Sequence, residues 1–112
     1  MDEEGIEGIR VHFAHLDSEG FDHAVPHLWE HSVAGSTPSD LLQFADRVAE
    51  LGFDVLEREP FQVPGRDTYV LNVRREQVHT PESLAAECDD LASLAEEYGL
   101  SLGGHAVRWT TE

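Results

Sequence analysis

Two places in the chain carry the same helix-start pattern, and together they limit the fold more than any other feature. At Ser36-Thr37-Pro38, with Thr37 or Ser36 as the cap, and again at Thr80-Pro81, a residue that caps helices comes ahead of a proline. Threonine accepts a hydrogen bond from the free N–H groups of a first helical turn, and proline fits the first helical position. Both places are therefore predicted to start a helix.

Each predicted helix has an apolar face and ends at a glycine, either Gly52 or Gly99, where left-handed backbone is expected. The apolar faces recur at steps of three and four residues, as an amphipathic helix requires. The first face comprises Leu41, Phe44, Ala45, Val48 and Leu51, and the second comprises Leu84, Cys88, Leu91, Ala95 and Tyr98.

Strands are predicted on both sides of each helix, at residues 28–34, 53–59, 67–75 and 100–109. The resulting order of strand, helix, strand, strand, helix, strand predicts an α+β fold. Specifically, it predicts a ferredoxin-like βαββαβ sandwich with two helices on one face of an antiparallel sheet. The other face of the sheet is then uncovered unless the N-terminal segment, a partner or a second copy lies on it.

The segment ahead of this unit alternates apolar Ile9, Val11 and Phe13 with polar residues. This period of two predicts an extra N-terminal strand that extends or covers the sheet. Residues 1–8 are acidic, contain glycine and are predicted to be frayed. A chain of 112 residues is expected to form a single domain, here residues 1–112.

The large excess of acidic residues limits the kinds of molecule that the protein is expected to bind. The chain has 23 acidic residues against seven arginines and no lysine, for a net charge of −16. Such a field repels phosphate backbones, so direct nucleic-acid binding is not expected. Acidic, lysine-free surfaces are typical of proteins from a halophilic, salt-rich cytoplasm, and the same field also steers a basic protein partner. Both explanations stay open at this point.

The sequence also predicts a cytoplasmic protein. No apolar run approaches the ~20 residues that span a bilayer, so no membrane association is expected. The first four residues are acidic where a secretory signal is basic. The one cysteine, Cys88, has no partner for an internal disulfide and lies on an apolar helix face, where a buried and inert thiol is expected.

Four sequence pieces are similar to a known family: EHSVA at 30–34, AELGFDVLE at 49–57, LAEEYG at 94–99 and GGHAVRW at 103–109. Over residues 28–109, taken as the family-like core, the chain resembles the regulator of ribonuclease E activity B family. The resemblance implies a ferredoxin-like fold. It also implies a small acidic protein that binds an endoribonuclease and restrains RNA cleavage without catalysis of its own.

The partner-binding candidates are Trp29, Tyr69, Arg74 and Trp109, because tryptophan, tyrosine and arginine are frequent among residues that dominate protein interfaces. Burial in the core is the alternative for the three aromatic residues, and an ordinary surface position is the alternative for Arg74. A homodimer is a second type of protein partner.

No sequence motif predicts catalysis or a cofactor, so a non-catalytic regulator is the first hypothesis. No metal is expected. If a metal binds, its candidate ligands are the residues His12, Asp22, His23, His27 and His31. The alternative hypothesis is a dimeric small-molecule or metal-binding domain with a histidine-lined pocket, to which Trp29, His31, His105 and Trp109 would contribute.

Overall fold

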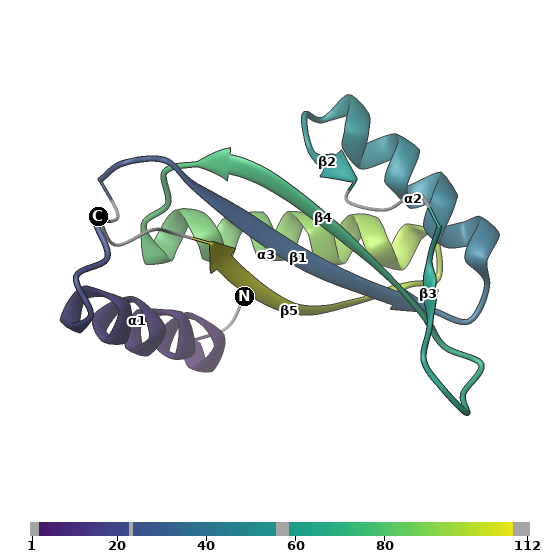
Figure 1. The fold of residues 1–112 in the computed structure, drawn as a ribbon, viewed down its shortest axis with the longest axis horizontal. Coiled ribbons are helices and arrows are strands. Elements are labelled where there is room, and N and C mark those ends of the chain that lie inside the picture. Colours follow the sequence, from purple (N-terminus) through teal and green to yellow (C-terminus); the bar gives the residue numbers. More distant parts are fainter. Residues whose placement is uncertain (1–2, 23, 56–58, 109–112) are drawn as a thin grey trace.

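The computed structural model describes residues 3–22, 24–55 and 59–108. In these ranges the chain forms three helices and five strands (Figure 1). In chain order they are α1 (Glu3–Ser18), β1 (His27–Gly35), α2 (Pro38–Glu50), β2 (Asp54–Val55), β3 (Phe61–Gln62), β4 (Tyr69–Gln77), α3 (Pro81–Glu97) and β5 (Ser101–Arg108).

The strands form one antiparallel sheet in the order β2-β4-β1-β5, and β3 pairs with the other end of β4. Asp54 of β2 lies opposite Arg74, and Phe61 of β3 lies opposite Val70. The two short strands therefore share one edge of β4 and together take the place of the single strand predicted at 53–59. This arrangement confirms the predicted α+β fold of ferredoxin-like type.

The helices cover one face of the sheet because alternate strand residues on that face are apolar. Val33 of β1 and Val73 of β4 are fully buried there, in a cluster with Leu41, Phe44 and Leu91 from α2 and α3. Both predicted apolar helix faces are thus confirmed except at Leu51, which follows the end of α2 and is 47% exposed. In Figure 1, α3 runs behind the sheet, with α1 and α2 toward its two ends.

The predicted N-terminal strand is wrong, because residues 9–16 belong to α1. Ile9, Phe13 and Leu16 are buried, and their steps of four and three residues fit a helix. Val11, which the alternating pattern placed with them, is 68% exposed. The helix starts at Glu3, so it also includes most of the segment predicted to be frayed.

Helix α1 packs against α3 and against the side of the sheet that the other helices cover. Its apolar residues form a second buried cluster with Trp29 of β1 and Leu84 and Cys88 of α3. The N-terminal segment therefore extends the helical layer rather than the sheet. In the described part of the chain, the opposite face of the sheet has no helix over it, as predicted.

The predicted helix ends are also observed. Gly52 and Gly99 both have positive φ, at 100° and 72°. Thr80 caps α3: its side chain accepts from the Ser83 N–H at 3.1 Å, and the Ser83 hydroxyl accepts from the Thr80 N–H at 2.8 Å. Thr37 precedes α2 in extended geometry but makes no side-chain capping bond.

Candidate functional site

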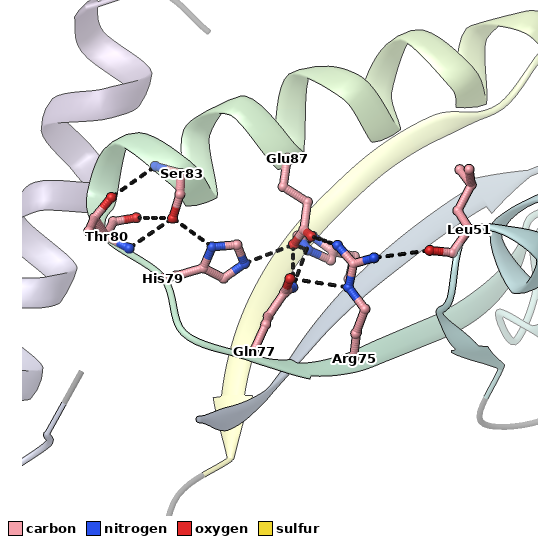
Figure 2. Close-up of polar contacts among 8 residues, drawn as sticks. Leu51, Arg75, Gln77, His79, Thr80, Ser83 and Glu87 are labelled. Carbon is pink, nitrogen blue, oxygen red and sulfur yellow. Dashed lines mark hydrogen bonds and ion pairs between the residues drawn. The ribbon is translucent and has the colours of Figure 1, made fainter. Parts of the chain in front are cut away.

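A buried carboxylate, Glu87 of α3, is contacted by side chains from the sheet and from the loop that follows β4 (Figure 2). The Nε2 atoms of His31 and His79 lie 2.9 and 3.0 Å from its Oε2 atom, in position to donate. Arg75 Nη2 donates to Oε1 at 2.8 Å. Gln77 Nε2 donates to both oxygens, at 2.9 and 2.8 Å. We call these five residues the Glu87 cluster.

The cluster is itself held on two sides. Arg75 Nη1 donates to the Leu51 carbonyl at 3.0 Å, and the Arg75 guanidinium lies 4.2 Å from the centre of the Phe53 ring. These contacts fix the end of α2 to β4. On the other side, His79 Nδ1 lies 2.9 Å from the hydroxyl of Ser83, the residue that completes the cap of α3.

The electrostatics keep Glu87 ionised. Its side chain is only 9% exposed, and this burial raises the pKa of the carboxyl. Hydrogen bonds from His31, His79 and Gln77 outweigh burial and hold the pKa well below its usual range. A general base works best when its pKa lies near the working pH, so this carboxylate is suited to holding structure rather than to moving protons.

Cys88, next to Glu87 in the sequence, is buried as predicted. Burial and the neighbouring carboxylate raise the pKa of its thiol to about 11. The reactive thiolate is therefore scarce near neutral pH, which fits an inert core cysteine rather than a nucleophile.

A hollow of about 510 Å³ opens beside the Glu87 cluster, between α3 and the end of β4. Leu51 and Val78, which are 47% and 49% exposed, lie on its rim with the carboxylate of Asp90. The remaining lining residues are Phe53, Arg75, Gln77, His79, Ser83, Ala86, Glu87, Leu91 and Leu94. The site is thus an apolar recess that has hydrogen-bonded polar side chains on one side and an acidic residue among its lining.

Sequence reasoning missed this site. One signal was present, because Glu87 lies three residues after Leu84 and four before Leu91, inside the apolar face of α3. A carboxylate in that position needs buried donors. Those donors come from β1, β4 and the loop after β4, and their pairing with α3 is a property of the tertiary fold.

The predicted partner-binding residues separate into different environments. Trp29 is 1% exposed and fills the core beneath α1, so it offers no surface to a partner. Tyr69 is half-buried against the core beneath α2 and α3. Arg74 lies on the uncovered face of the sheet, and its Nε atom is buried without a hydrogen-bond partner. Trp109 and His23 lie outside the described residues.

The candidate metal ligands do not gather at one place. His31 belongs to the Glu87 cluster, whereas His12 lies beside His105, with ring centres 5.6 Å apart. His27 Nε2 lies 2.6 Å from the backbone carbonyl of Asp22. Across the described ranges, no group of three or more His, Cys, Asp or Glu residues is arranged to hold a metal ion. Of the histidines described, His79 is the one that lines the hollow.

None of the helices described is both long enough and apolar enough to cross a membrane.

A family model, rather than a curated protein, matches this chain. No curated protein matches the chain. The model of the family "regulator of ribonuclease activity B" matches residues 9–107. This match begins within α1 and ends within β5, so it reaches further toward the N-terminus than residues 28–109, which carried the resemblance. The chain therefore belongs to the regulator of ribonuclease activity B family, whose members regulate ribonucleases rather than catalyse a reaction.

Proposed function

We propose that this protein binds a ribonuclease and inhibits its cleavage of RNA without catalysing a reaction itself. The observation that carries this function is the family match over residues 9–107. The chemistry of the interior agrees with it, because the Glu87 carboxylate is ionised and occupied by donors, and the Cys88 thiol is protonated. We assign this activity to the cytoplasm.

The helical layer is the surface that best suits such a partner. The three helices carry 13 of the 23 acidic residues of the chain and only two of its seven arginines. A ribonuclease must present a basic surface to hold the phosphates of RNA. An acidic layer is complementary to that surface, and contact there would exclude RNA from it.

The hollow beside the Glu87 cluster provides an anchor point within this acidic layer. Interfaces are commonly dominated by a few side chains that enter well-packed pockets. Leu51 and Val78 offer exposed apolar contact, and Asp90 offers a carboxylate at the rim. The chemistry fits an apolar side chain of the ribonuclease that has an arginine or lysine beside it.

The test is capture of partners from the native host at the salt concentration of its cytoplasm, followed by identification of the retained proteins. We expect a ribonuclease to be retained by the wild-type chain and depleted by the paired variant Asp90→Asn/Glu97→Gln, which removes two exposed acids from α3. The matched control is Glu59→Gln/Asp67→Asn, which removes two exposed acids that belong to no helix.

Two results would overturn parts of this proposal. Recovery of no ribonuclease or RNA-degradation factor by the wild-type chain contradicts the function itself. Equal retention of a ribonuclease by both paired variants contradicts the assignment of the α3 side of the helical layer as its contact surface.

A further inference from the structure

On the uncovered face of the sheet, side chains of the same chemical kind lie side by side on neighbouring strands. Side chains alternate along a strand, so the neighbours of the buried strand residues point to this face. On the two central strands these are Leu28, Glu30, Ser32 and Ala34 of β1, and Val70, Asn72, Arg74 and Glu76 of β4.

Cross-strand pairing arranges these residues in rows. In an apolar row, Ala34 lies opposite Val70, which pairs on its other side with Phe61, a side chain that is 60% exposed. In a polar row, Ser32 lies opposite Asn72, and the serine hydroxyl donates to Asn72 Oδ1 at 2.7 Å. Each row therefore crosses both central strands.

A charged row follows, in which Glu30 lies opposite Arg74 and Arg74 pairs on its other side with Asp54. The Nε atom of Arg74 is buried without a hydrogen-bond partner. A buried donor without an acceptor is unfavourable, so this guanidinium gains from a further acceptor brought close to it.

The charge of this face differs from that of the rest of the molecule. Among the strand residues that the structure describes, the acids on this face by register are Glu30, Asp54 and Glu76. Arg74 lies on it with them, and the backbone position of Arg108 lies opposite Leu28. A basic surface is therefore not attracted here as it is to the helices. Two copies of a chain with a net charge of −16, in contrast, repel one another least when they approach through this face.

We propose that a second copy of this chain covers the uncovered sheet face, related by a two-fold axis that runs along the strands between β1 and β4. Rotation about that axis exchanges the positions of β1 and β4 but keeps every row at its own height. Arg74 of each copy then faces Glu30 of the other, and Val70 of each faces Ala34 of the other. Such an interface is self-complementary, as a two-fold dimer requires, and it is an aligned packing of two sheets.

The net charge makes this association depend on salt. Charges outside the interface repel across the dimer, and at molar salt this repulsion is screened over roughly 3 Å. We therefore expect the dimer to be tighter in concentrated salt than in dilute buffer. A dimer held only by exposed ion pairs would instead become weaker in concentrated salt, because salt screens their attraction.

Exchanging the charges of Arg74 and Glu30 tests the proposed two-fold axis. The molecular mass in solution is measured by sedimentation velocity in concentrated salt for wild type, Arg74→Glu, Glu30→Arg and the double variant. Each single variant places like charges opposite one another and is expected to weaken the dimer by ~100-fold or more. The double variant re-forms both Arg–Glu pairs with exchanged positions and is expected to restore it. Arg47→Glu on α2 makes the same charge change away from the interface and is expected to stay dimeric.

A wild-type chain that is monomeric in concentrated salt contradicts the dimer. Single variants that stay dimeric, or a double variant that fails to recover, contradict the proposed axis. Circular dichroism of every variant separates a lost interface from a lost fold. If a single variant does not fold, Phe61→Asp replaces it, with Val11→Asp, another exposed apolar position, on α1, as its control.

Discussion

At the scale of single residues, Glu87 shows how an acid is kept inside a small domain. It accepts hydrogen bonds from His31, Arg75, Gln77 and His79, which lie on two strands and a loop. A buried carboxylate without such donors would lose the free energy of its hydration with no compensation. The cluster therefore couples α3 to the sheet through one side chain.

Glu87→Gln tests this coupling. The amide has one acceptor atom in place of two and presents its NH₂ group to donors, so at least one buried donor is left unpaired. We expect the free energy of unfolding to fall by about 2–4 kcal/mol, as measured by urea denaturation. Asp90→Asn, one turn further along α3 and exposed, is the control and is expected to change it by less than about 0.5 kcal/mol.

The contribution of Glu87 to the free energy of unfolding is expected to depend on pH. The pKa of Glu87 is lower in the folded chain than in the unfolded chain, where a glutamate titrates near 4.3. Its contribution to stability is therefore fully present above that value and is lost as the pH falls below it. We expect the stability difference between wild type and Glu87→Gln to be constant from pH 6 to 8 and to shrink from about pH 5 downward. A difference that grows in acid would contradict an ionised Glu87.

At the scale of secondary-structure elements, what could be predicted from sequence depended on local information. The two helices with Thr-Pro starts were predicted because caps, apolar faces and terminal glycines all lie within the segment itself. Helix α1 has no such start, and the alternation around Val11 concealed the three- and four-residue spacing of Ile6, Ile9, Phe13 and Leu16. The Glu87 cluster was not predictable, since His31 is 56 residues from its acceptor.

The caps of α2 and α3 provide a matched pair for a test at this scale. Thr80 bonds to the first turn of α3, whereas Thr37 makes no such bond to α2. We expect Thr80→Ala to lower the free energy of unfolding by about 1 kcal/mol, and Thr37→Ala to lower it by a few tenths at most. If thermal or urea unfolding gives the same loss of free energy for both variants, the hydrogen bond of the Thr80 side chain adds no stability to α3 beyond the intrinsic preferences of the two residues.

At the scale of the whole molecule, the fold separates two kinds of surface. Three helices on one side of the sheet carry 13 acidic residues, whereas the described strands place Glu30, Asp54, Glu76 and Arg74 on the other side. This separation follows from βαββαβ topology, which places all crossover connections on one face. It allows the helical layer to contact a basic ribonuclease while the sheet contacts a second copy, so the two proposed interactions do not compete for surface.

The most direct test of ribonuclease regulation is the rate at which the captured ribonuclease cleaves RNA as this protein is added, at the salt concentration of the host. We expect the rate to fall toward zero as the ribonuclease becomes saturated. We also expect Asp90→Asn/Glu97→Gln to require ~3–10-fold more protein for the same effect, because two contacts of the acidic helical layer are missing. Cleavage that continues at the same rate with the protein in excess would contradict the proposed inhibition.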